Sequence, residues 1–238
     1  MEARERMELV GRVVDVLGRK MDACARAGRH PGDVEVIAVT KTVPVELARA
    51  VSDAGIHHLG ESRPQELWGK AATIDRAIWW HLIGHLQRNK VERTLPLVHM
   101  IHSVDSLRLF TALEQEAARQ LRVVDVLLQV NASREASKHG FAPDEVPALA
   151  AEINNLRNVR VRGLMTMAAY DEDPEKSRPT FALVRQLRDR LRGELGPTHA
   201  LEHLSMGMSN DFEVAVEEGA TLVRLGSVLF EGLEGGTA

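Results

Sequence analysis

The sequence predicts an α/β protein built as a closed (β/α)8 barrel of the TIM type. Short β-branched runs alternate with longer segments that have helical spacing, which indicates βα units around a parallel sheet. Eight such runs within 238 residues favour closure into a barrel, with an open doubly wound sheet as the alternative. Because no low-complexity linker divides the chain, we expect one domain over residues 1–238, with a helix at its N-terminus.

The expected elements follow one another in regular order. The strands are expected at 34–41, 57–61, 79–84, 100–104, 124–130, 159–167, 203–208 and 221–229. The helices with the clearest spacing are expected at 2–27, 45–54, 106–122, 145–156, 174–193 and 211–218. Pro44 fits the first turn of its helix, and two capping boxes, Ser62 with Gln65 and Asn210 with Glu213, mark helix starts. Ser209 is a further candidate cap.

Composition narrows the classes of function. With 30 basic and 34 acidic residues the net charge is −4, so no general nucleic-acid footprint is expected. The lone cysteine, Cys24, excludes an internal disulfide and reads as a small buried hydrophobe. No stretch approaches the ~20 apolar residues of a membrane span, so we expect a cytoplasmic protein without membrane contact. The expected closed barrel, without an obvious exposed apolar stripe, also favours a monomer.

Lys41 is the first candidate for a reactive side chain. In V-E-V-I-A-V-T-K, strand alternation puts Lys41 on the same face as Ile37 and Val39. If those two fill the barrel, Lys41 points into its mouth, where partial desolvation would lower its pKa and allow attack on an aldehyde. A lysine that reaches solvent or pairs with an acid is the alternative.

Two Gly- and Ser-rich strand ends form the second candidate feature. H-L-S-M-G-M-S-N-D at 203–211 contains Ser209, and L-V-R-L-G-S at 222–227 contains Arg224, Gly226 and Ser227. Such ends can direct N–H groups and hydroxyls at one phosphate, and phosphate sites after strands seven and eight are frequent in barrels. Arg224 on the interior face would need an acceptor or an anion. Together with Lys41, this pattern suits a phosphorylated aldehyde.

Other marked residues favour structural roles. His81 and His85 are four apart in a strand-to-loop context without a third ligand at suitable spacing, so we predict no metal site. Trp79 and Trp80 read as packing groups. Met165 reads first as core filling and second as a cavity wall against a ring.

Several segments together resemble the pyridoxal phosphate homeostasis proteins, which share the fold of the alanine racemase N-terminal domain. They are A-V-T-K-T at 38–42, L-G-E-S-R-P-Q-E at 59–66, W-H-L-I-G-H-L-Q-R-N-K at 80–90, I-H-S-V-D-S at 101–106, L-Q-V-N-A-S-R-E-A-S-K-H-G-F at 128–141, R-G-L-M-T-M at 162–167 and the run at 204–227. They span nearly the whole chain in the expected order.

The resemblance implies a pyridoxal 5'-phosphate cofactor held as an aldimine on Lys41. It implies that Ser209, Gly226 and Ser227 hold the phosphate and that Arg224 faces the pyridine nitrogen. The cofactor-binding set that we predict is Lys41, Ser62, Met165, Ser205, Met206, Ser209, Arg224, Gly226 and Ser227. Ser62 stands where the family usually has an asparagine that contacts the ring hydroxyl, and the shorter serine puts that contact in doubt.

The sequence is compatible with three functions. The first is a non-catalytic carrier that buffers pyridoxal phosphate and passes it to apo-enzymes. The second is a weak amino-acid racemase, with Lys41 as the catalytic residue. Racemisation needs acid–base groups on both faces of the substrate carbon, and the only tyrosine, Tyr170, has no assigned place. Alanine racemases draw that tyrosine from a second domain, which we do not expect in this chain. The third is a sugar-phosphate barrel enzyme without pyridoxal phosphate.

Overall fold

The computed structural model describes residues 2–133 and 139–233. Within this part the strands form a closed parallel barrel in sequence order, and β1 pairs with β8 to close it. The predicted (β/α)8 barrel is therefore confirmed, and the open sheet is excluded. Of the matched segment at 128–141, residues 134–138 lie outside the described residues.

The strands are β1 (Glu35–Val39), β2 (His58–Glu61), β3 (Trp79–Leu82), β4 (Met100–Val104), β5 (Val124–Gln129), β6 (Val159–Met165), β7 (His203–Ser205) and β8 (Leu222–Leu225). The α-helices are α1 (Ala3–Arg26), α2 (Val45–Asp53), α3 (Pro64–Thr73), α4 (Val91–Thr94), α5 (Leu107–Arg119), α6 (Ala150–Asn154), α7 (Arg178–Arg192), α8 (Phe212–Glu217) and α9 (Ser227–Phe230). Short 3-10 helices are η1 (Pro31–Asp33), η2 (Arg88–Lys90), η3 (Val146–Leu149) and η4 (Pro174–Ser177).

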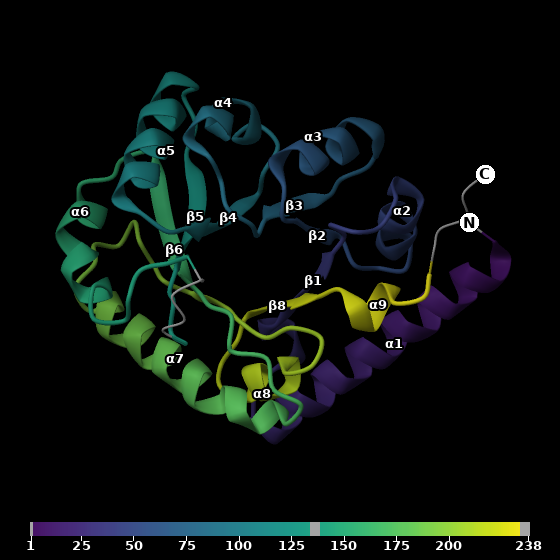
Figure 1. Ribbon diagram of the computed structural model, residues 1–238. Coiled ribbons are helices and arrows are strands. Elements are labelled where there is room, and N and C mark those ends of the chain that lie inside the picture. The colour runs from purple at the N-terminus through teal and green to yellow at the C-terminus, as the bar shows by residue number, and fades with distance from the viewer. Residues whose placement is uncertain (1, 134–138, 234–238) are drawn as a thin grey trace.

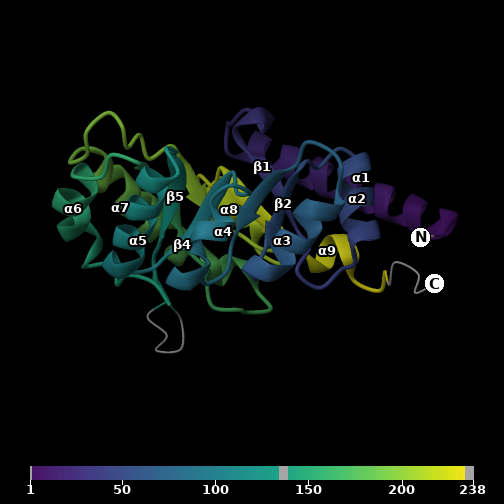
Figure 2. The same cartoon turned by 90° about the horizontal axis from the view of Figure 1, so that it is seen from above.

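Helices cover the outside of the barrel, and α1 crosses it along α8 and α9 (Figures 1 and 2). The main core lies between the sheet and these helices and includes Cys24 of α1, as expected. A second, smaller group fills part of the barrel interior. We call Ile37, Met100, Leu127, Met165 and Leu222 the interior apolar cluster, against which Met167 packs. Reading Met165 as core filling is therefore confirmed.

Helix α1 fastens the last βα units of the chain. Arg19 and Arg26 form ion pairs with Glu213 of α8, and Arg12 donates to the carbonyl oxygens of Leu229 and Glu231 around α9. The N-terminal helix thus holds the segment that follows β8, where the Gly- and Ser-rich turn lies.

Six of the eight strands end earlier than the sequence predicts, and three of these strand ends shape the mouth of the barrel. The expected strand at 203–208 ends at Ser205, because Gly207 takes a φ of 93°, a left-handed conformation that ends the ladder. The expected strand at 221–229 ends at Leu225, and the chain turns at Gly226 directly into α9. The first strand likewise ends at Val39, so that Lys41 lies in the turn that follows.

None of the helices in residues 2–133 and 139–233 has the combination of length and apolar character required to traverse a lipid bilayer.

Candidate functional site

The mouth of the barrel brings together strand ends that are far apart in the sequence. Because β1 pairs with β8, the turn that carries Lys41 lies beside the turn at Gly226. A Cβ built on Gly226 would lie 3.6 Å from the Cβ and the carbonyl oxygen of Val39, which confirms how close the two strand ends are. Barrel closure therefore unites the predicted lysine and the predicted anion turn.

Lys41 itself is exposed, which agrees with the alternative of a lysine that reaches solvent and not with partial desolvation. Ile37 does fill the barrel interior, and Val39 is half-buried on the way to the mouth. Since β1 stops at Val39, Lys41 stands above the packed interior, and no ion pair is found for it within the described residues. Burial of its amine would have to come from a molecule bound at the mouth.

A buried polar cluster that sequence reasoning missed fixes the turn of Lys41. The Thr40 hydroxyl donates to Glu61 Oε1 at 2.6 Å. Lys70 Nζ donates to the same Oε1 at 2.7 Å and to the Thr40 carbonyl at 2.5 Å. All three side chains are buried, and Glu61 Oε2 has no hydrogen-bond partner among the described residues. The only sequence signal was a glutamate at a strand end, which local patterns do not pair with Lys70.

Ser209 lies at the centre of the Gly- and Ser-rich turns. Its Oγ accepts hydrogen bonds from the backbone N–H groups of Gly226 at 3.2 Å and Val228 at 3.3 Å. Two backbone donors from the β8–α9 turn thus converge on one oxygen from the β7–α8 loop. Gly226 is half-buried and Ser227 is exposed beside them. This arrangement of donors suits an anionic oxygen.

The predicted capping roles in this region are wrong. Helix α8 begins at Phe212 after Asp211, and Asn210 Nδ2 instead donates to the Asp171 carbonyl at 2.8 Å. Asp211 holds the loop, since its Oδ1 accepts from the Met208 N–H. Helix α3 begins at Pro64 without a side-chain cap, so the Ser62 and Gln65 box is also absent. Ser62 is half-buried at the end of β2, on the side of the mouth next to β1.

The side chains of Ser205 and Met206 lie on opposite sides of the sheet at the end of β7. Ser205 is fully buried and points into the barrel interior, where it contacts Arg224 and His102. The Met206 side chain packs in the main core between the sheet and the helices. Only the backbone of Met206 therefore remains available as a contact at the mouth.

Arg224 is buried inside the barrel without a carboxylate against it. Its Nη1 donates to Ser205 Oγ at 2.6 Å, and its Nη2 donates to the Thr166 carbonyl at 2.9 Å. No ion pair of Arg224 is found within residues 2–133 and 139–233. Burial lowers its pKa to about 10, so the guanidinium stays charged at neutral pH. A charged donor in this position needs an external acceptor to complete its environment.

The hydrogen bonds of Arg224 continue through three histidines. His102 Nδ1 lies 2.9 Å from Ser205 Oγ, His102 Nε2 lies 2.8 Å from His81 Nδ1, and His81 Nε2 lies 2.9 Å from His58 Nδ1. We call this set, His58, His81, His102, Ser205 and Arg224, the histidine column. Burial, the largest cause, lowers the pKa of His81 and His102 well below the ordinary value, so both rings are neutral.

The donors of the column can be assigned from Arg224 outward. A guanidinium only donates, so the Ser205 oxygen accepts from it and retains its own proton to donate to His102 Nδ1. His102 then carries its proton on Nε2 and donates to His81, which donates in the same sense to His58. The opposite order would leave the buried Ser205 proton without an acceptor among its partners. The column therefore holds Arg224 in one orientation.

The fold separates the two histidines that sequence spacing paired. His81 lies within the column, whereas His85 is exposed on the rim, 3.0 Å from the Asp105 carboxylate. Trp80 is a core residue, and the half-exposed Trp79 stacks on His58. Tyr170 is 80% exposed on the loop after β6.

Comparison with known proteins identifies the family of the chain. The model of the family described as "Alanine racemase, N-terminal domain" matches residues 20–234. A pyridoxal phosphate homeostasis protein of Aquifex aeolicus is 43% identical over 225 residues, which cover 94% of this chain and 98% of that protein.

Two solved structures resemble the chain over nearly its full length. A Bifidobacterium adolescentis protein of unknown function is 36% identical, with a TM-score of 0.89 and 97% of each chain covered. PipY of Synechococcus elongatus PCC7942, solved with PLP bound, is 33% identical, with a TM-score of 0.80 and 93% of this chain and 99% of that chain covered. The barrel, its strand-end residues and these relatives together establish that the chain belongs to the alanine racemase N-terminal domain family and, within it, to the pyridoxal phosphate homeostasis proteins.

Proposed function

We propose that this protein binds pyridoxal 5'-phosphate at the mouth of its barrel and takes part in the intracellular homeostasis of that cofactor without robust catalysis. The observation that carries the proposal is the closure of β1 on β8, which sets Lys41 beside the Gly226 turn. The PLP-bound PipY structure and the names of the relatives support it.

The residues at the mouth fit the chemical groups of this cofactor. The N–H groups of Gly226 and Val228, which converge on Ser209 Oγ, suit the phosphate together with the exposed Ser227. The buried charge of Arg224 suits an uncharged ring nitrogen as its acceptor. Ser62 lies at the neighbouring strand end, where a ring hydroxyl would have to be contacted.

Pyridoxal phosphate, when bound, supplies an aldehyde that can react with a primary amine. Lys41 is the amine at this mouth, and its turn is held by the Lys70 contact with the Thr40 carbonyl. Arg224 cannot accept a proton and, held by Ser205, would offer a bound ring nitrogen only a hydrogen-bond donor. An unprotonated ring nitrogen makes a weak electron sink, which disfavours transamination and argues for a carrier.

The position of Tyr170 argues against a racemase. Two-sided proton transfer needs an acid–base group opposite Lys41, and Tyr170, the only tyrosine, is 80% exposed.

We further propose that the protein is a single barrel domain that acts as a cytoplasmic, monomeric carrier and delivers its cofactor to PLP-dependent apo-enzymes.

The first experiment tests covalent binding. We expect the purified protein mixed with pyridoxal phosphate to develop a visible-edge absorbance band. Borohydride should abolish the band and leave the added mass on the peptide containing Lys41. Lys41→Ala should lose the band and the trapped mass, whereas Lys176→Ala, which removes an exposed surface lysine, should retain both. Trapping on another lysine would refute the role of Lys41, and no band at all would refute the proposal and favour a barrel enzyme without this cofactor.

The second experiment separates the carrier from the racemase. The loaded protein is incubated with single-enantiomer amino acids, and chirality is followed against the Lys41→Ala control. We expect no interconversion above that control. Clear turnover would establish the racemase instead.

A further inference from the structure

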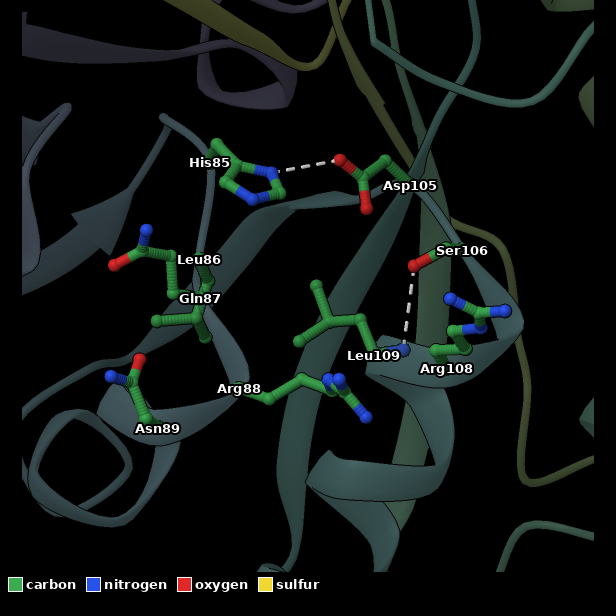
Figure 3. Close-up of a pocket in the computed structure, with 9 residues that line it drawn as sticks. All are labelled: His85, Leu86, Gln87, Arg88, Asn89, Asp105, Ser106, Arg108 and Leu109. Atoms are coloured by element: carbon green, nitrogen blue, oxygen red, sulfur yellow. Dashed lines mark hydrogen bonds and ion pairs between the residues drawn. The ribbon is translucent and has the colours of Figure 1, made fainter.

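Three side chains with metal-ligand chemistry meet on the rim of the barrel, apart from the candidate cofactor contacts. His85 follows β3, Asp105 follows β4 directly, and His139 lies in the loop after β5. Spacing in the sequence gave His85 no third ligand, because its partners come from the next two strand ends. Figure 3 shows His85 and Asp105 pointing toward one another at one end of a surface cavity.

The distances suit one ion between the three groups. His85 Nδ1 lies 3.0 Å and His139 Nδ1 lies 4.0 Å from the same oxygen, Asp105 Oδ2. All three ligand atoms lie within 4.8 Å of one another. A tetrahedral ion with bonds of about 2.1 Å requires ligand atoms about 3.4 Å apart, so only small side-chain rotations are needed.

A simple hydrogen bond accounts for only part of this arrangement. It explains His85 and Asp105, but His139 Nδ1 is too far from Asp105 Oδ2 to share the bond. The His139 ring nevertheless stacks on His85, with centroids 5.0 Å apart and planes 21° apart, and turns its Nδ1 to the same oxygen. Two imidazole nitrogens directed at one carboxylate oxygen is the pattern expected of a ligand set.

Burial gives the cluster a fixed base and an open side. The Asp105 side chain is only 8% exposed, whereas those of His85 and His139 are 49% and 69% exposed. An ion held here would keep positions for water. The adjoining cavity of about 510 Å³ is lined by His85 and Asp105 at one end and by Arg88 and Arg108 at the other (Figure 3).

We propose that His85, Asp105 and His139 form a binding site for a divalent transition metal ion of the Zn²⁺ class. Two imidazoles and one carboxylate favour such ions over Mg²⁺ and Ca²⁺, which prefer oxygen ligands alone. The three ligands leave at least one coordination position open to solvent, as in exchangeable rather than structural sites. The site does not depend on the proposed cofactor function.

The experiment titrates Co²⁺, and then Zn²⁺ in competition, into the untagged, chelator-treated protein without pyridoxal phosphate. We expect visible Co²⁺ bands that saturate at one ion per chain and disappear on adding Zn²⁺. Zn²⁺ should also raise the midpoint of thermal unfolding, because it binds the folded state. Mg²⁺ should displace nothing.

Three variants and one matched control identify the ligands. His85→Ala, His139→Ala and Asp105→Asn should each weaken Co²⁺ binding by about tenfold or more, since even outer-shell changes cost this much. His57→Ala, which removes an exposed imidazole elsewhere, should bind as the parent does. Thermal unfolding without metal verifies that each variant is folded. Unchanged affinity in the three ligand variants, or an equal loss in His57→Ala, would overturn the proposal.

Discussion

Two groups of side chains share the interior of the barrel, and different interactions hold them together. The interior apolar cluster fills volume with hydrocarbon and thioether side chains that contact one another without direction. The histidine column is joined end to end by hydrogen bonds between 2.6 and 2.9 Å, each with an assigned donor. The cluster therefore contributes stability, while the column contributes the position of one charged group, Arg224.

The two groups differ because the free energy of removing their side chains from water differs. Burial of the apolar side chains is favourable by itself. Burial of the imidazoles, the serine and the guanidinium is unfavourable unless every donor and acceptor is matched. The column holds Arg224 in one position, and the proposed cofactor contact requires a donor that is fixed in this way.

The largest expected effect comes from breaking the apolar cluster. Leu127 is fully buried, and Leu127→Ala should lower the free energy of unfolding by about 2–5 kcal/mol through lost burial and the cavity left behind. Urea denaturation measures this. Leu127→Met, which conserves volume, should cost less than about 1.5 kcal/mol. Equal losses in both variants would show that packing does not govern this half of the interior.

Sequence patterns identified the parts of the site that depend on local periodicity. Alternation along the strands put Ile37 and Lys41 on one face and Leu222 and Arg224 on one face, because that rule needs no distant partner. The structure shows that Ile37, Leu222 and Arg224 lie inside the barrel. The parallel barrel followed from the same regular alternation of elements.

Partners that are distant in sequence could not be found in this way. The hydroxyl of Ser209 fits a helix cap by local rules, yet the fold gives it the N–H groups of Gly226 and Val228 instead. His102 and Ser205 are 103 residues apart, and nothing in either segment signals the other. The sequence also left open whether Lys41 is exposed or partly desolvated, since that depends on where β1 ends.

Acid should weaken the protein through the column before carboxylates begin to titrate. His81 and His102 have pKa values well below the ordinary value near 6.5, chiefly because of burial. Below about pH 6.5 the unfolded chain binds protons that the folded chain does not, so stability falls as pH falls. Each ring contributes a slope of up to about 1.4 kcal/mol per pH unit.

Urea denaturation between about pH 6.5 and about pH 5 measures that slope. A double variant with His81→Gln and His102→Gln removes the two rings whose pKa is lowered most and retains amide hydrogen-bonding groups, so its stability should change less with pH. A flat profile in the parent protein would mean that the buried rings are already charged, contrary to the donor order assigned here.

Removing Ser205, which joins Arg224 to the histidines, tests whether the histidine column positions Arg224 and does not merely fill space as the interior apolar cluster does. Ser205→Ala leaves the facing Arg224 and His102 nitrogens without their partner and should cost about 1–3 kcal/mol of stability. It should also weaken pyridoxal phosphate binding, because the guanidinium loses its fixed orientation. Calorimetry on apo-protein gives the affinity.

The control for this loss is Ser103→Ala. Ser103 is a buried serine whose hydroxyl donates to the Gly84 carbonyl at 2.6 Å, outside the column. Its removal should lower stability and leave cofactor affinity unchanged. If both serine variants lower affinity alike, general destabilisation rather than the position of Arg224 is responsible.

The smallest effect is expected at the outer end of the column. His58 is half-buried, accepts one hydrogen bond from His81 and stacks on Trp79 with planes 10° apart. His58→Phe retains the stacking and leaves the buried Nε2–H of His81 without its acceptor. Ser205→Ala leaves groups on both Arg224 and His102 without a partner, so we expect the smaller loss here, about 1 kcal/mol. Cofactor affinity should fall less than in Ser205→Ala. A larger fall at His58 than at Ser205 would mean that the column is anchored at its outer end, and that Arg224 is positioned through the whole series of rings rather than by Ser205 directly.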